Sequence, residues 1–217
     1  MDTIFALASA PGKAGISIVR LSGPLAINVA EKLTKSKLKE KQPNLRVIYD
    51  SDNHFIDQAL ILIFRKPYSF TGENVVEFHL HGSSAVVSSV IKLLGNFKGL
   101  RSAEAGEFTR CALENGKIDL AQVEGLADLI DAETDAQHKQ AARIFNGALG
   151  EKTKEWRAKL VKAGALLVAT LDFADEEVPE EVTPEVEKLI NMVLSDLDKQ
   201  IIGVQTAERI RSGFEVA

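Results

Sequence analysis

Three titratable side chains alternate along one β-like run of the sequence. The segment Val75–Gly82 places Glu77, His79 and His81 two residues apart, so on a strand they share one face. A carboxylate there can accept two parallel N–H bonds from the edge of a pterin or guanine-like heterocycle. The two histidines could instead ligate a metal, although no third ligand motif accompanies them. The same pattern is also typical of an exposed polar strand face that binds no ligand. On physical chemistry alone, this last interpretation is favoured.

Two basic residues could complete an anion-binding site. Arg20 lies in the apolar β-like run Ile16–Leu21, on the same face as its isoleucines. An arginine on such a face needs a carboxylate or an anionic ligand, unless it reaches solvent at the strand end. Lys117 follows a predicted turn at Asn115–Gly116, where it could meet an anionic ligand tail or be an ordinary solvated lysine.

Neither glycine–lysine pair in the sequence belongs to a phosphate-binding loop. Gly12–Lys13 lacks the upstream glycine at the required spacing and the following Ser or Thr, and Gly116–Lys117 is followed by Ile118. Cys111, the only cysteine, lies in a mostly apolar helical segment. That setting is more typical of a small buried hydrophobe than of a nucleophile.

The bulk composition limits the classes of function. The chain has 217 residues, of which 45% are hydrophobic and 26% charged, an ordinary globular composition. Its formal net charge of -5 gives no sequence-wide attraction to nucleic acid phosphates, so any RNA contact must come from a local basic patch, another domain or a partner. No secretory signal is visible, and no apolar stretch approaches the ~20 residues that span a bilayer. We expect a cytoplasmic protein without membrane association.

One local basic patch is present in the second half of the chain. Glu151 and Glu155 interleave with its cations, which favours a solvated helix face with i,i+4 pairs over an RNA-facing surface. The cations of this patch are Lys152, Lys154, Arg157, Lys159 and Lys162.

The chain before Asp119 alternates between short β-like runs and segments rich in Gly, Pro, Ser and Asn. Helices are predicted from Pro24, in the first turn, to about Lys35 and from Ser83 to Leu94, capped by Ser83 or Ser84. This irregular alternation favours an α+β layer fold over a regular βαβ array. The predicted strands are Ile4–Ala8, Ile16–Leu21, Leu45–Tyr49, Ala59–Phe64 and Val75–Leu80.

After Asp119 the pattern is almost wholly helical, which predicts a helical bundle. Two helices begin at capping boxes, in which Asp119 precedes Gln122 and Thr134 precedes Gln137. The acidic stretch Asp172–Glu181 predicts a turn. The three predicted helices cover Leu120–Ala132, Asp135–Leu171 and Thr183–Arg211.

Five segments together carry a family resemblance. Each alone is modest, but their order and spacing are specific, and they span the chain from end to end. Taken together they resemble the MnmE (TrmE) family of tRNA modification GTPases. The segments are 2–23, Ser69–Glu77, Gly106–Gln122, Ala127–Ala132 and Asp172–Glu177.

The resemblance implies a domain organisation. Residues 1–118 would form an α+β domain similar to the tetrahydrofolate-binding domains of aminomethyltransferases. Residues 119–212 would form an incomplete helical bundle domain. Residues 213–217, which include the strand-like Phe214–Ala217, would be the start of a truncated GTPase domain.

The resemblance also implies a cofactor and partners. The N-terminal domain would dimerise and hold 5-formyl- or 5,10-methylene-tetrahydrofolate near the dimer interface, with Arg20, Glu77 and Lys117 at the family's folate-contacting positions. Family members build an aminomethyl-type group on C5 of the wobble uridine of certain tRNAs, together with the flavoprotein MnmG (GidA). GTP hydrolysis that depends on potassium and magnesium drives their conformational cycle. This sequence has no Walker-type loop, so we expect the chain alone neither to hydrolyse GTP nor to complete the modification.

Three departures from the family pattern, at Ala14, Ser83 and Ala105, leave the proposed folate contacts intact. Two other hypotheses remain open. A freestanding folate-dependent aminomethyltransferase would need an acidic catalytic residue and further domains, and the long helical half argues against it. A purely structural dimerisation scaffold would bind no folate.

Overall fold

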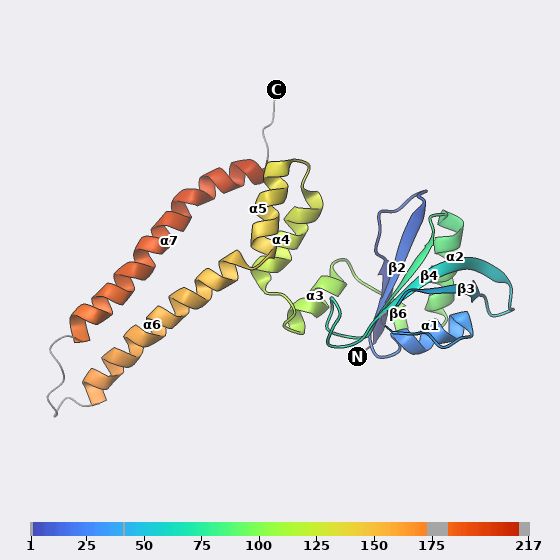
Figure 1. The fold of residues 1–217 in the computed structure, drawn as a ribbon, viewed down its shortest axis with the longest axis horizontal. Helices are drawn as coiled ribbons and strands as arrows, with labels where there is room; N and C mark the ends of the chain where they lie inside the picture. The colour runs from blue at the N-terminus through green and yellow to red at the C-terminus, as the bar shows by residue number, and fades with distance from the viewer. Residues whose placement is uncertain (1, 41, 173–181, 213–217) are drawn as a thin grey trace, which may run out of the picture. The chain divides into compact units, whose positions relative to one another are not determined.

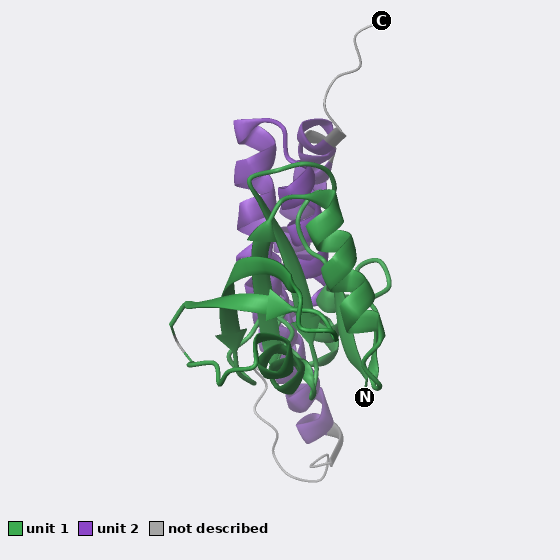
Figure 2. Cartoon of the chain, turned by 90° about the vertical axis from the view of Figure 1, so that its right-hand side faces the viewer, with its two compact units in different colours: residues 1–118 green, residues 119–217 purple. Residues whose placement is uncertain are grey.

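The computed structural model describes residues 2–40, 42–172 and 182–212. The chain divides into two compact units, Met1–Ile118 and Asp119–Ala217, which Figure 2 shows in different colours. The first unit combines a sheet with helices, and the described residues of the second unit form helices and the turns between them (Figure 1). This confirms the predicted class, an α+β domain followed by a helical one. The predicted turn at 173–181 and the predicted strand start at 213–217 lie outside the described residues.

Six strands form one sheet in the first unit, in the order β3-β4-β5-β2-β1-β6. Neighbouring strands run antiparallel, except that β1 and β6 run parallel. The five predicted strands are confirmed, whereas β6 has only three residues and is too short to show a period in the sequence. The strands are β1 (Thr3–Leu7), β2 (Ile16–Ser22), β3 (Asn44–Tyr49), β4 (Phe55–Phe64), β5 (Val75–His81) and β6 (Leu100–Ser102).

Two helices, α1 (Ala26–Thr34) and α2 (Ser84–Gly95), cover one face of this sheet. Their apolar side chains join those of the central strands in a single buried core, which excludes water and provides the main stabilising term. The start of α1 differs from the prediction, because Pro24 precedes the N-cap residue Leu25 and does not lie in the first turn. Ser83 is the N-cap residue of α2, but its side chain makes no capping hydrogen bond.

The other face of the sheet carries the polar residues singled out above. The β2–β5 register places Arg20 opposite Glu77 and Ile18 opposite His79. The helix α3 (Glu107–Glu114) and the loop between β4 and β5 supply further side chains near Arg20.

The second unit consists of α4 (Leu120–Asp131), α5 (Asp135–Phe145), α6 (Ala148–Asp172) and α7 (Val182–Ser212). Both predicted capping boxes are confirmed, with reciprocal hydrogen bonds in each. The prediction of one continuous helix over 135–171 is wrong. The chain leaves the helix at Asn146 and Gly147, where the glycine φ of 86° provides a turn that other residues adopt only with strain. Among the described residues, no helix combines the length and the apolar character needed to cross a membrane.

Gly125 lets α4 and α5 pack closely. A Cβ on Gly125 would lie 2.7 Å from the backbone nitrogen of Phe145 and 2.9 Å from Cγ2 of Ile144. Because backbone atoms cannot move aside as a side chain can, we expect Gly125→Ala to destabilise the helical unit by about 1–3 kcal/mol. Urea denaturation followed by circular dichroism measures this change.

Gly164 provides the matched control within the same unit. It lies inside α6, and a Cβ there would meet nothing within 4 Å. We expect Gly164→Ala to stabilise the helix by about 0.5–1 kcal/mol, because alanine loses less backbone entropy on folding. Equal stabilisation by both substitutions would contradict the close packing at Gly125.

Candidate functional site

An ion pair between Arg20 and Glu77 forms the centre of the candidate site. Nε and Nη2 of Arg20 each lie 2.8 Å from Oε1 of Glu77. The two side chains are only 27% and 14% exposed, so the pair is shielded but open to solvent on one side. The antiparallel register of β2 and β5 creates this contact, because it sets the two residues directly opposite each other.

Two aromatic rings flank the guanidinium of Arg20. Its central carbon lies 5.8 Å from the ring centroid of Phe70 and 5.5 Å from that of Phe108. These distances allow a cation–π attraction to each ring. Phe70 comes from the loop between β4 and β5, and Phe108 from α3, so two separate elements converge on one side chain.

Hydroxyl groups hold the Phe70 loop against the sheet. Ser22 Oγ donates to Oε2 of Glu73 at 2.8 Å and lies 2.7 Å from Oγ1 of Thr71. A serine hydroxyl carries one proton, so Thr71 is the donor in the second contact. The side-chain amide of Asn115 also donates to the Thr71 carbonyl at 2.7 Å, which joins the segment after α3 to the same loop.

Lys117 lies against this loop and not against the ion pair. Its ammonium donates to the Pro67 carbonyl at 2.9 Å, and a Cβ on Gly72 would meet Cγ of Lys117 at 3.3 Å. In the part of the chain that the structure describes, no hydrogen bond or ion pair joins Lys117 to Arg20 or Glu77. The structure therefore brings two of the three predicted ligand contacts together and leaves the third on the loop beside them.

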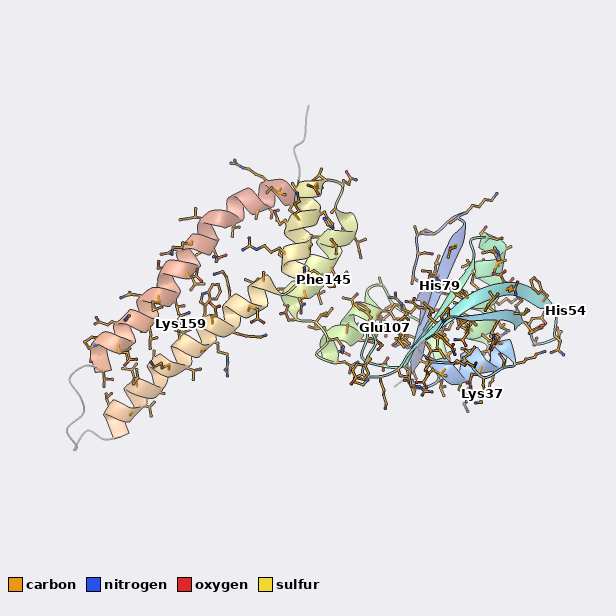
Figure 3. The ribbon with its side chains drawn as sticks, in the orientation of Figure 1. Lys37, His54, His79, Glu107, Phe145 and Lys159 are labelled. Carbon is orange, nitrogen blue, oxygen red and sulfur yellow. The ribbon has the colours of Figure 1, made fainter. Side chains whose placement is uncertain are left out.

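The side chain of His79, which Figure 3 labels, places a ring nitrogen without a hydrogen bond near Glu77. Its Nε2 lies 3.4 Å from Oε2 of Glu77, yet the geometry makes no hydrogen bond. Within the described ranges it is the only buried side-chain nitrogen or oxygen without a hydrogen-bond partner. A buried polar atom in this state is costly, so a ligand or water that reaches Nε2 would gain a hydrogen bond.

His81 does not join this group, because its ring pairs with Asp57 on β4. Nδ1 of His81 lies 2.7 Å from Oδ1 of Asp57, and the backbone N–H of His81 donates to Oδ2 at 2.9 Å. Asp57 is buried and was missed by the sequence reasoning, although an aspartate inside the apolar run Phe55–Phe64 is itself a signal. The pair links the last residue of β5 to β4 by side-chain hydrogen bonds.

The metal-binding alternative for the β5 histidines has no support in the geometry. Within the described residues, the one group of three side chains placed to share a cation is Asp50, Asp52 and His54, in the exposed turn between β3 and β4. Cys111 is half-buried, and burial raises the pKa of its thiol, which disfavours the nucleophilic thiolate.

A buried carboxylate, Glu107, fixes the helix that carries Phe108 (Figure 3). Its Oε1 accepts from Nη2 of Arg101 at 2.6 Å, and its Oε2 accepts from Nη1 at 2.9 Å. The backbone N–H of Glu104 also donates to Oε2, at 2.7 Å. Hydrogen bonding from Arg101 is the main reason why the pKa of Glu107 falls to about 2. The Arg101–Glu107 pair thus ties α3 to β6.

Comparison with known proteins gives two family matches along the chain. Residues 3–117 match the family described as GTP-binding protein TrmE N-terminus, and residues 120–215 match the MnmE helical domain. Similar proteins named tRNA modification GTPase MnmE occur in Roseobacter denitrificans at 59% identity, Ruegeria pomeroyi at 57% and Paracoccus denitrificans at 50%. Each alignment covers 100% of this chain and 51% of the relative.

The chain therefore spans about half the length of the curated relatives that it matches. The order of the two matches follows the order of the two units, with the sheet first and the helices second. The two family matches cover nearly the whole chain, and the identities to these relatives are 50% or more. This degree of similarity shows membership of the family and not only a shared fold. The chain belongs to the MnmE (TrmE) family of tRNA modification GTPases.

Proposed function

We propose that the first unit binds a one-carbon tetrahydrofolate, in the 5-formyl or 5,10-methylene form, and dimerises. Glu77, Arg20 and Lys117 are its proposed folate contacts. The second oxygen of Glu77 is the observation that carries this proposal. Oε1 binds Arg20, while Oε2 lies 3.4 Å from Nε2 of His79 and accepts no hydrogen bond from any described residue. Oε2 can therefore accept an N–H from a pterin ring while the ion pair stays intact.

The surroundings of the ion pair fit a flat heterocycle with N–H donors. The rings of Phe70 and Phe108 provide apolar surface beside the Arg20 guanidinium that pairs with the carboxylate. A second parallel N–H bond, to Oε1, requires one of the two contacts between Arg20 and that oxygen to break. The guanidinium released in this way, and Lys117 on the neighbouring loop, are the cations available to the glutamate carboxylates of folate.

The open face of the sheet supports the dimer proposal. Apolar side chains of β2, β3 and β4 are exposed there and beside it, and exposed apolar patches on a soluble domain mark interaction surfaces. A second copy of this chain is the proposed partner, in line with the dimerisation that the family resemblance implies. The exposed residues are Ile16 at 62%, Leu45 at 56%, Leu60 at 38%, Phe64 at 38% and Tyr68 at 86%.

The second unit also leaves apolar side chains uncovered. Leu160 and Val161 on α6 are 49% and 55% exposed, and Ile201 and Ile202 on α7 are 64% and 77% exposed. Helices with this much exposed apolar surface need further packing partners. We propose that these packing partners come from the remaining half of the full-length protein, because the second unit is an incomplete helical bundle.

As part of the full-length protein, the chain is proposed to act in the cytoplasm on tRNA. The reaction would install an aminomethyl-type group at C5 of the wobble uridine, with the flavoprotein MnmG (GidA) as partner. GTP hydrolysis with potassium and magnesium would occur in the other half of the protein, since no nucleotide-phosphate loop is present in this sequence.

Calorimetric titration of the protein with 5-formyltetrahydrofolate tests the proposal. We expect saturable binding, and sedimentation of the same sample should show a dimer. Binding without catalytic turnover of an added aminomethyl donor would exclude a freestanding aminomethyltransferase. A correctly folded dimer that shows no heat of binding would contradict the folate proposal and leave a dimerisation scaffold.

A further inference from the structure

A groove with a volume of about 640 Å³ runs along α7 and is bordered by α6. Lys188, Met192, Ser195 and Lys199 follow one another on α7 at spacings of four, three and four residues, so they form one stripe. Lys159, which Figure 3 labels midway along α6, also lines the groove. Asn191 and Asp196 complete the lining.

The three groove lysines differ from other lysines of the same unit. Lys139, Lys154 and Lys162 each hold a carboxylate, with Nζ–O distances of 2.6 to 2.7 Å. In contrast, no side chain among the described residues forms an ion pair or hydrogen bond with the groove lysines, which are Lys159, Lys188 and Lys199. Their positive charge is therefore available to a ligand.

The carboxylate of Asp196, the acidic residue that lines the groove, already has hydrogen-bond partners within the protein. Lys152 Nζ lies 2.9 Å from Oδ2 and 3.2 Å from Oδ1 of Asp196, and the indole N–H of Trp156 donates to Oδ2 at 2.9 Å. These contacts lower the pKa of Asp196, with the Lys152 hydrogen bond as the largest cause. Lys199 also acts on Asp196, and Lys188 acts on Glu185, through charge attraction without a hydrogen bond. Because Lys152 balances the charge of Asp196, the lining of the groove still has an excess of positive charge.

We propose that this groove binds the sugar–phosphate backbone of the tRNA substrate. The assignment rests on the proposed function, which supplies RNA as the polyanion. Lys188 and Lys199 lie 11 residues apart, or about 16 Å along a helix, a span that covers several phosphates of a nucleic acid strand. Asn191 and Ser195 between them can donate hydrogen bonds to phosphate oxygens without reading a base. In a chain with net charge -5, phosphate contacts made by the chain itself require a local basic patch of this kind.

Binding of an unmodified tRNA transcript at several salt concentrations, followed by fluorescence anisotropy, tests the groove. We expect the triple variant Lys159→Gln, Lys188→Gln, Lys199→Gln to bind more weakly by on the order of tenfold or more. The slope of log K against log salt should become shallower by about 2, because each lost phosphate contact removes roughly 0.7 to 0.9. Arginine at the same three positions should preserve the slope.

The matched control removes the same charge outside the groove. The triple variant Lys139→Gln, Lys154→Gln, Lys162→Gln should keep the original slope, since these lysines are already paired. Equal weakening by both triple variants would overturn the assignment, because net charge alone would then explain binding. Displacement of the tRNA by polyglutamate of matched charge would overturn it in favour of an acidic polypeptide. Folate titration of the groove variant is expected to be unchanged, so a failure of this proposal is distinguishable from a failure of the folate proposal.

Discussion

Replacement of Glu77 by alanine is expected to weaken binding of 5-formyltetrahydrofolate by on the order of 100-fold. Hydrogen bonds to a charged group contribute about 1.5–3 kcal/mol each, and about 2.7 kcal/mol corresponds to that factor. The variant loses Oε2, the oxygen of Glu77 that accepts no hydrogen bond from a described residue. It also leaves Arg20 without its counter-ion. Calorimetric titration at constant pH and salt measures the change.

Two further variants separate ligand recognition from general damage. His54→Ala removes an exposed imidazole that pairs only with Asp50 in the β3–β4 turn, so folate affinity should stay unchanged. Glu77→Gln keeps the shape of the side chain but can present an amide N–H to a ligand N–H donor, and we expect a loss close to that of alanine. If Glu77→Ala bound folate as tightly as His54→Ala, Glu77 would have no part in the site.

The sequence predicts the surroundings of the site better than its assembly. Strand alternation correctly places Glu77 and Arg20 away from the apolar core, and both capping boxes correctly mark helix starts. The contact between Arg20 and Glu77 depends on the β2–β5 register across 57 residues of chain, which no local pattern encodes. The convergence of Phe70 and Phe108 on Arg20 is a tertiary feature for the same reason.

Two differences between the sequence interpretation and the structure have physical causes. The apolar period runs on through Asn146–Gly147, so local periodicity predicts one helix where a single glycine with positive φ ends it. Alternation correctly assigns His81 to the face of Glu77, but its ring pairs with the buried carboxylate of Asp57 and so does not join Glu77 and His79 in one group. In the first case a backbone preference overrides a regular pattern, and in the second a hydrogen bond decides which of the residues on one face come together.

The basic patch shows how tertiary structure regroups a sequence feature. Sequence spacing unites Lys152, Lys154, Arg157, Lys159 and Lys162 on one helix and predicts pairs within that helix. The structure shows one such pair, between Lys154 and Glu151 at i,i+3, whereas Lys152 and Lys162 pair with Asp196 and Glu185 of α7. Lys159 lines the groove together with lysines from α7, more than 25 residues away in the chain. The distribution of carboxylates on the neighbouring helix decides which lysines remain free, and a one-helix pattern contains no information about it.

Replacement of Glu107 by glutamine is expected to destabilise the first unit by about 2–3 kcal/mol at pH 7. Glu107 is buried and accepts three short hydrogen bonds, two of them from Arg101. An amide of the same size accepts at one atom only and turns its NH₂ towards the donors, so the pair is broken while one partner stays in place. The 45% exposure of the Arg101 side chain keeps the loss below the about 3–5 kcal/mol typical of a broken buried pair, because water can solvate the released guanidinium. Urea denaturation followed by circular dichroism gives the free energy of unfolding.

The pH dependence of that difference identifies its cause. The pKa of Glu107 is about 2 in the folded protein, below its ordinary value of 4.5, so the ionised carboxylate stabilises the fold fully above about pH 5. This contribution is lost as the pH falls from 4.5 towards 2, and the wild-type and Glu107→Gln curves should converge over that interval. A gap that stays constant from pH 7 to pH 3 would show that packing and not charge is responsible. Because α3 carries Phe108, the variant should also weaken folate binding at neutral pH, whereas Gly164→Ala in the other unit should not.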